Sequence, residues 1–265
     1  MGFTPYRDVN ALIDTLDSEI ARVLGPRLVG LYLVGSLVTG DFDHHVSDID
    51  LIAVAATEIP NDELTDLHRM HRAIAAAHPI WDNRVEVIYV TREALQTFRV
   101  ERYTLAVVSP GEPFHTLEAG TDWLINWYLL RTRGIAVRGP SPAAFLEPFT
   151  TDDLVDAAIG IARDLAGRVR TVTRRNPGVY MVLTGCRALH SVTLRAFTSK
   201  RRAAAWAMDA MPDHAPTIAD ALRIWRTDWY NSETDNAGPL AGAVDFADAV
   251  VLRTDTLRKN QMTTG

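Results

Sequence analysis

The segment from Leu31 to Val54 constrains the fold of this chain more than any other part of the sequence. It reads LYLVGSLVTGDFDHHVSDIDLIAV, in which one apolar run ends in Gly35 and Ser36 and a second opens with Asp48 and Asp50. Alternate side chains of a strand point to the same face, so the two aspartates present their carboxylates on one side. The sequence therefore predicts two strands joined by a turn, with paired acids at the start of the second strand.

These residue types suit the binding of a divalent metal ion and a phosphate group. Magnesium prefers oxygen ligands and usually binds through one or two carboxylates together with substrate phosphates. Glycine and serine after a strand let backbone N–H groups and a hydroxyl approach a phosphate. We therefore predict Asp48 and Asp50 as metal ligands, and Gly35, Ser36 and Ser47 as nucleotide-binding residues. The alternative is a pair of solvated acids that end an edge strand, which leaves Gly35 and Ser36 unexplained.

Length, charge and cysteine content limit the class of protein. The 265 residues, 47% of them hydrophobic, are enough for two modest domains. A formal net charge of −6 argues against a broad nucleic-acid-binding surface. We see no bilayer-spanning apolar stretch and no secretory signal, and the single cysteine, Cys186, agrees with a reducing compartment. We therefore expect a cytoplasmic monomer without nucleic-acid or membrane partners.

Apolar periodicity predicts alternating helices and strands in the first half of the chain. Glu86 lies on the third of these strands, on the face opposite to Val85 and Val87, so its carboxylate is either exposed or functional. The predicted helices are 8–24, 63–77 and 121–133, and the predicted strands are 28–34, 48–55, 84–90 and 135–138.

The run from Gly139 to Pro142 is the strongest signal in the sequence for a break in secondary structure. We place a linker from there to about Pro148. The predicted domains are 1–140 and 149–265. The second half is helical throughout, with Asn176, Pro177 and Gly178 expected to separate its first two helices. Its predicted helices are 151–173, 179–198, 201–211, 217–230 and 242–259. The fold class is α+β, a mixed sheet with helices followed by an all-α bundle.

These motifs resemble the nucleotidyltransferase superfamily, whose signature is GS followed after a spacer by DxD. Here it stands as Gly35, Ser36, Asp48 and Asp50. Within the superfamily the chain is similar to the aminoglycoside 3''-adenylyltransferases that modify streptomycin and spectinomycin. That narrower resemblance lies in VRGPSPAAFLEPFTTDDL, VLTGCRALHSV and KRRAAAWAMDAMP of the second half. It implies an N-terminal nucleotidyltransferase domain followed by a helical domain.

The resemblance also implies a role for individual residues. Asp48 and Asp50 would hold Mg²⁺, Glu86 would be the catalytic base, and Arg187 and Lys200 would contact the phosphates of ATP. The implied reaction moves AMP from ATP to a hydroxyl of a small molecule, with an aminoglycoside as acceptor and antibiotic resistance as the outcome. Two alternatives stay open: the same chemistry on a neutral or anionic acceptor, and a non-catalytic nucleotide-binding or antitoxin-like protein. The three acids together count against the second, because binding alone needs no base.

One segment departs from the streptomycin-modifying enzymes, which carry tryptophan and acidic residues there. Residues 167–180 read GRVRTVTRRNPGVY, with four arginines and no carboxylate. If these arginines face the cleft, they would repel a cationic acceptor. The alternative is that they are solvated along a helix. The four are Arg168, Arg170, Arg174 and Arg175. Trp225 could stack on adenine, although its helical spacing with Leu222 and Trp229 favours a core position.

Overall fold

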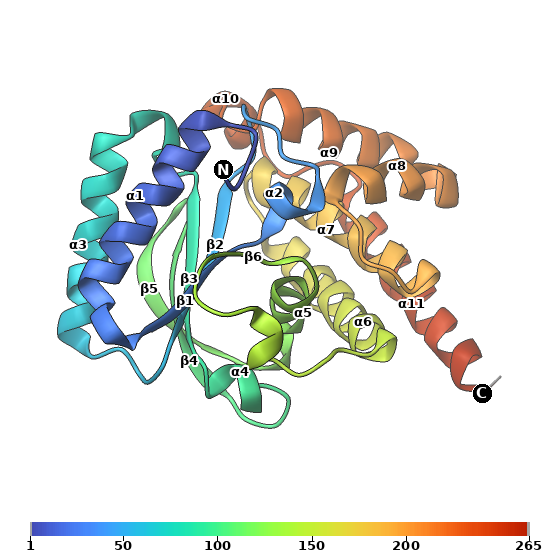
Figure 1. Ribbon diagram of the computed structural model, residues 1–265. Helices are drawn as coiled ribbons and strands as arrows, with labels where there is room; N and C mark the ends of the chain where they lie inside the picture. The colour runs from blue at the N-terminus through green and yellow to red at the C-terminus, as the bar shows by residue number, and fades with distance from the viewer. Residues whose placement is uncertain (1, 264–265) are drawn as a thin grey trace. The chain divides into compact units, whose positions relative to one another are not determined.

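A computed structural model describes residues 2–263 of the chain (Figure 1). Its contacts group the chain into two compact units. The sheet unit comprises Met1–Phe42 and Ser47–Pro148, and the helical unit comprises Asp43–Val46 and Phe149–Gly265. Among the described residues, no helix combines the length and the apolar character that crossing a membrane requires.

The sheet unit is built on a six-stranded mixed sheet in the order β5-β4-β3-β2-β1-β6. β2 and β3 run parallel, whereas the other neighbouring strands pair antiparallel. A parallel pair needs a crossover connection, and α3 supplies it. The strands are β1 (Leu28–Leu33), β2 (Ile49–Ala55), β3 (Val85–Thr91), β4 (Tyr103–Ser109), β5 (Glu112–Ala119) and β6 (Ile135–Arg138).

Helices α1 and α3 lie side by side on one face of this sheet (Figure 1). Their apolar stripes pack on strand residues such as Leu33, Leu51 and Val87, which are fully buried. Because strand side chains alternate between faces, Asp50 and Glu86 point to the opposite face. The helices of the unit are α1 (Arg7–Leu24), α2 (Gly35–Thr39), α3 (Asn61–Ala77), α4 (Ala94–Thr97) and α5 (Leu124–Arg133).

The predicted α+β fold class is confirmed, but the hairpin of β4 and β5 was not predicted. Most residues of β5 are exposed or half-buried, so this strand lacks the apolar alternation by which strands are recognised. The hairpin extends the sheet beyond β3 and places Ser109, the last residue of β4, beside Glu86.

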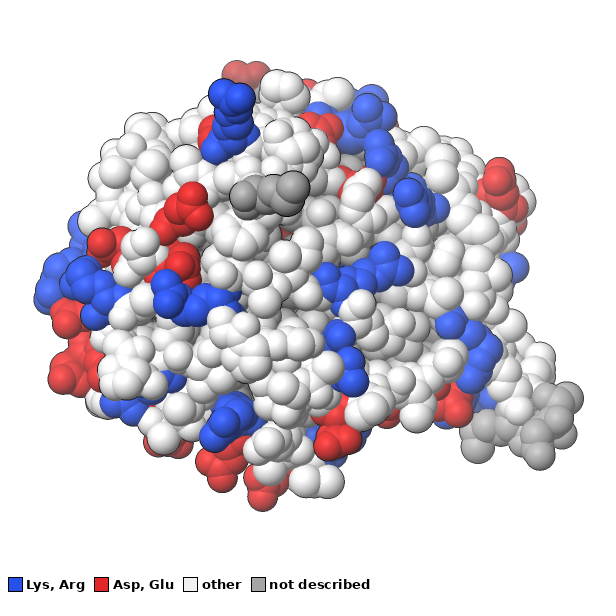
Figure 2. Space-filling model, viewed as in Figure 1, with Lys and Arg blue, Asp and Glu red and all other residues white. Residues whose placement is uncertain are grey.

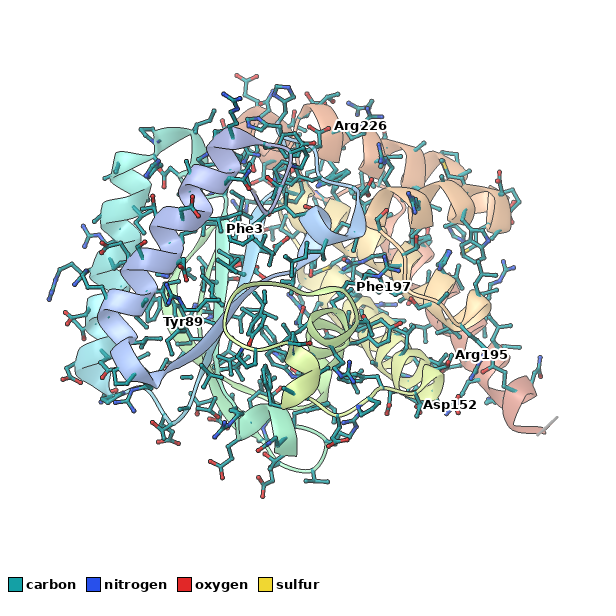
Figure 3. All side chains as sticks on the ribbon, in the orientation of Figure 1. Phe3, Tyr89, Asp152, Arg195, Phe197 and Arg226 are labelled. Carbon is teal, nitrogen blue, oxygen red and sulfur yellow. The ribbon has the colours of Figure 1, made fainter. Side chains whose placement is uncertain are left out.

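The helical unit is a bundle around α7, which is buried along most of its length. Its core is formed by apolar side chains of α6, α7, α8, α9 and α11. Arg195, after α7, pairs with Asp152 of α6 at 3.0 Å, and Figure 3 shows the two side chains together. The helices are α6 (Thr151–Arg168), α7 (Arg175–Leu194), α8 (Lys200–Ala210), α9 (Ala215–Thr227), α10 (Ser232–Asn236) and α11 (Ala243–Thr263).

A break separates the first two of these helices, but its predicted position was wrong. Helix α6 ends at Arg168, and the first turn of α7 contains Asn176, Pro177 and Gly178. Proline is tolerated there because a first-turn N–H has no partner within the helix. Asn176 also donates from Nδ2 to the carbonyl of Trp229 at 2.7 Å. Tertiary contacts and position within the turn therefore allow a helix to start on residues that usually end one.

Candidate active site

Gly35 lies where β1 ends and touches the strand that carries Asp50. The N–H of Val34 donates to the carbonyl of Asp50 at 3.0 Å, so the chain leaves β1 directly beside β2. Gly35 has a φ of +66°, and a Cβ at this position would overlap the Asp50 carboxylate. Both the backbone conformation and the close approach therefore require glycine.

The register of the sheet places Asp50 next to Glu86. These residues are paired across the parallel strands β2 and β3, and neighbouring strands lie about 4.8 Å apart. Asp48 precedes Asp50 by two positions, at the entry to β2. All three side chains are half-buried. The sheet thus brings together the two aspartates of the DxD motif and the glutamate of the next strand.

Two serines of the predicted site lie in the same part of the sheet unit. The hydroxyl of Ser36 is buried and has no hydrogen-bond partner within the described chain. Ser47 is 4% exposed, and its carbonyl accepts a 2.6 Å hydrogen bond from Nη2 of Arg84. The Arg84 guanidinium also stacks on Trp81 at 4.6 Å. Arg84 therefore anchors the backbone immediately before Asp48.

The residues present fit a magnesium ion and a nucleotide phosphate. The space beside Gly35, next to the Asp50 carboxylate, admits no Cβ. The Ser36 hydroxyl is buried and needs a partner that the described protein does not supply. Over residues 2–263, no group of three or more His, Cys, Asp or Glu side chains is arranged to hold a metal ion by itself. A site of one or two carboxylates completed by substrate phosphates is the usual arrangement for Mg²⁺.

Arg187 and Lys200 belong to the helical unit. Arg187 is half-buried on α7, with its guanidinium 5.6 Å from the ring centroid of Phe197. Lys200 is the first residue of α8, and its Nζ lies 4.8 Å from the ring centroid of Tyr180. Such cation–π contacts hold long side chains without neutralising their charge. The predicted roles of both residues toward phosphate stay predictions.

The four arginines of residues 167–180 are all engaged within the helical unit. Three pair with carboxylates, and Arg175 donates to the carbonyls of Ala237 and Gly238 at 2.8 and 3.1 Å. Figure 2 shows basic and acidic side chains interspersed over the visible face of the molecule. The ion pairs are Arg168 with Asp164 at 3.2 Å, Arg170 with Asp248 at 2.7 Å and Arg174 with Asp235 at 3.0 Å. The segment is thus far less cationic than its sequence alone indicates.

Two other side chains of the helical unit, Cys186 and Trp225, contribute to the packing of the bundle. Burial raises the pKa of the Cys186 thiol to about 12, which leaves it protonated and unreactive near neutral pH. Trp225 is partly buried and packs on the apolar core of the bundle. Trp225 therefore takes the core position that its helical spacing favours.

Sequence reasoning missed two residues that act on the predicted site. Arg84 anchors the backbone before Asp48, and Ser109 donates from Oγ to Oε2 of Glu86 at 2.9 Å. Ser109 lies 23 residues from Glu86, so only the strand register brings them together. Arg84 could have been noticed as a charged residue beginning an apolar strand, whereas no local signal marks Ser109.

A mixed sheet in which the GS motif begins helix α2 against the DxD strand, followed by a helical bundle, defines the nucleotidyltransferase class of fold. Within it, residues 145–251 match the family model described as aminoglycoside adenylyltransferase, C-terminal domain. The resemblance to aminoglycoside adenylyltransferases predicted from the sequence is thereby confirmed.

One similar solved structure is that of the spectinomycin adenyltransferase AAD(9) from Enterococcus faecialis with ATP and spectinomycin. The two proteins share 15% sequence identity and superpose with a TM-score of 0.74, over 92% of this chain and 98% of that one. At this identity the likeness establishes a common fold. No curated protein matches this sequence.

Proposed function

We propose that this protein is a magnesium-dependent adenylyltransferase that moves AMP from ATP to a hydroxyl of a small molecule, most simply an aminoglycoside. One observation carries the proposal: Asp50 and Glu86 are register partners on parallel strands, and Gly35 packs against the Asp50 carboxylate. Metal ligand, base and phosphate cradle then lie within one patch of one sheet. The helical family match and the ATP-bound structure of similar fold support the same reaction.

Each acid of the patch has a distinct chemical task in this reaction. Glu86 accepts the proton of the acceptor hydroxyl as its oxygen attacks the α-phosphorus of ATP, and pyrophosphate leaves on the opposite side. Asp48 and Asp50 would hold magnesium, which would offset charge on the transferred and leaving groups. The hydroxyl of Ser36 donates to a phosphate oxygen, and Ser47 shapes the approach to it.

The helical unit contributes positive charge to the departing pyrophosphate. A guanidinium offers a planar fork to phosphate oxygens, and an ammonium acts as a mobile point charge. Arg187 and Lys200 are assigned these roles through the family resemblance. Their contacts with Phe197 and Tyr180 support the assignment, because each side chain is oriented while it keeps its charge.

The charge balance is compatible with a cationic acceptor. Paired arginines repel a cation much less than unpaired ones, and the protein carries a net charge of −6. The similar structure that holds spectinomycin supports an aminocyclitol acceptor. We propose in addition that the protein acts as a monomer with domains 1–140 and 149–265. Its use of ATP supports the cytoplasmic location predicted from the sequence, and acceptor modification would confer antibiotic resistance.

The test is incubation of the purified protein with MgATP and spectinomycin, streptomycin, or neutral and anionic sugars. Pyrophosphate release together with a gain of one AMP in acceptor mass is expected for an aminocyclitol. Asp48→Asn and Glu86→Gln should each lower turnover by at least about a hundredfold, the usual scale for a lost catalytic acid or base. Asp66→Asn serves as control, because Asp66 lies on α3 in an exposed pair with Arg69.

Three results would contradict parts of the proposal. Turnover with uncharged or anionic acceptors alone would overturn the acceptor assignment and keep the chemistry. ATP binding without pyrophosphate release for any acceptor would favour the non-catalytic alternative. Full activity of Asp48→Asn would remove the metal assignment.

A further inference from the structure

The hydroxyl of Ser109 makes a defined contact with the proposed catalytic base. Ser109 Oγ donates to Oε2 of Glu86 at 2.9 Å, and the pair is partly buried. The register of β3 and β4 pairs Val87 with Val108, so Ser109 stands directly across from Glu86. Side chains that are opposite on neighbouring antiparallel strands lie on the same face and interact. The contact is therefore built into the pairing of the two strands.

The turn after Ser109 holds the serine at this register. Gly111 in the turn has a φ of +79°, and its N–H donates to Oδ1 of Asn83. Asn83 lies just before β3 and also has a positive φ, of 58°. The turn that begins at Ser109 is thus fastened to the loop that leads into the strand of Glu86. This second connection keeps Ser109 from sliding along β3.

The Ser109 hydroxyl is a neutral donor to Glu86. Nearby charged groups are Asp50 beside Glu86 on β2 and Glu112 across from Ser109 on β5, while the Arg84 guanidinium donates to the Ser47 carbonyl. Helix α2, which packs on β2, has the sequence GSLVT and carries no charge. The Ser109 hydroxyl orients the carboxylate through a hydrogen bond and brings no formal charge of its own.

We propose that Ser109 is a positioning residue, whose hydroxyl holds the Glu86 carboxylate in the orientation in which it takes the proton of the acceptor. The inference rests on the proposed function, in which Glu86 is the base. Ser109 touches neither substrate nor metal in this role and acts only through Glu86. Well-oriented groups react far faster than loosely held ones, and small misplacements of a catalytic group are costly.

Three variants of strand β4 test this role. Ser109→Ala should lower kcat on the order of tenfold, while KM for MgATP and for spectinomycin changes less than about twofold. Ser109→Thr keeps the hydroxyl and should restore kcat to within about threefold of wild type, because a branched side chain suits a strand.

Thr104→Ala is the matched control. Thr104 lies on the same strand and donates from Oγ1 to Oε1 of Glu118 at 2.9 Å, in an exposed pair. The Thr104→Ala variant loses the same kind of cross-strand hydrogen bond at a position away from Glu86, so its kinetics should equal those of wild type. A loss of kcat in Thr104→Ala equal to that in Ser109→Ala would mean a general effect on the hairpin and would overturn the inference. Unchanged kcat in Ser109→Ala would also overturn it.

A double-mutant cycle separates this inference from the proposed function. If Glu86 is the base and Ser109 acts through it, Ser109→Ala should cause no further loss in a Glu86→Gln background. Full activity of Glu86→Gln alone would refute the base assignment, whatever Ser109 does. A further tenfold loss in the double variant would refute the positioning role and leave the base assignment standing.

One readout needs no acceptor. NMR relaxation of ¹³C-labelled Glu86 reports the order of its side chain, which should fall in Ser109→Ala and stay unchanged in Ser109→Thr and Thr104→Ala. Equal order in all four proteins would overturn the inference, even if no acceptor in the panel is modified. Absence of AMP transfer by the wild type would instead count against the proposed function.

Discussion

At the scale of single residues, two features require glycine at position 35: its positive φ and the close approach of Asp50. Comparison with Gly40, which has only the positive φ, separates the two effects. Gly35 and Gly40 have φ values of +66° and +72°, but only at Gly35 would a Cβ meet another group, the Asp50 carboxylate. We predict that Gly40→Ala costs about 1–2 kcal/mol of stability and keeps activity. Gly35→Ala should cost more and also abolish AMP transfer, because Asp50 is displaced.

Urea denaturation and the AMP-transfer assay measure the two effects. An active Gly35→Ala variant would show that the site tolerates displacement of Asp50. It would thereby contradict the role of Asp50 as a metal ligand.

His71 makes the stability of the protein depend on pH. It is 8% exposed, and its Nε2 lies 2.6 Å from the hydroxyl of Tyr89, whose side chain Figure 3 places behind α1. Burial, with a smaller contribution from the charge of His68, lowers the pKa of His71 to about 4. The unfolded chain has the ordinary value and binds the proton first, so stability is complete above pH 6.5 and falls toward pH 4.

We predict a loss of about 2 kcal/mol from this group between pH 7.5 and pH 5. Urea denaturation at the two pH values measures it. His71→Gln keeps a polar partner for Tyr89 and should remove this part of the pH dependence, whereas substitution of the exposed His45 by Gln should leave it in place. Equal slopes for wild type and His71→Gln would contradict the assignment.

At the scale of elements, the start of α6 illustrates a local signal that the structure uses. Thr150 accepts a hydrogen bond from the N–H of Asp153 at 3.0 Å, and the Asp153 carboxylate accepts one from the N–H of Thr150 at 2.7 Å. This reciprocal capping box satisfies two donors at the helix end. Thr150→Ala should destabilise the protein by about 1 kcal/mol in urea denaturation.

Thr151→Ala, one position later, is the control and should change stability by less than about 0.5 kcal/mol. A similar loss in both variants would mean that the cap contributes nothing specific to the stability of α6.

The boundaries of helices and strands were predicted correctly where residues close in the sequence mark them. Their prediction failed where distant contacts decide them. The helix at α1 follows from its apolar spacing and from the stop signal of Gly25 and Pro26. The start of α7 does not, because Pro177 and Gly178 indicate a break that contacts with the segment after α9 override. Strand β5 of the β4–β5 hairpin was missed because exposed strands lack the alternation that a buried face imposes.

At the scale of the whole molecule, ligand binding should be visible in stability. A ligand that binds only the folded state at a hundred times its Kd stabilises that state by about 2.7 kcal/mol, which raises Tm by a few degrees. We predict such a rise with MgATP in thermal denaturation. In Asp50→Asn, the rise with MgATP should shrink to that seen with ATP and EDTA.

Asp66→Asn should keep the full magnesium-dependent shift, because its carboxylate lies in an exposed pair on α3. A full shift in Asp50→Asn would show that magnesium is held elsewhere.

The sequence by itself determined the α+β class, most of the longer helices and strands, and the GS and DxD motifs, since each depends on residues close together in the chain. Only the tertiary structure decided which distant side chains meet. It paired Glu86 with Ser109, and it supplied Asp235 and Asp248 to arginines that appeared unpaired. Strand register and helix packing are set by the sum of many contacts across the fold, so no local pattern specifies the partner of a single side chain.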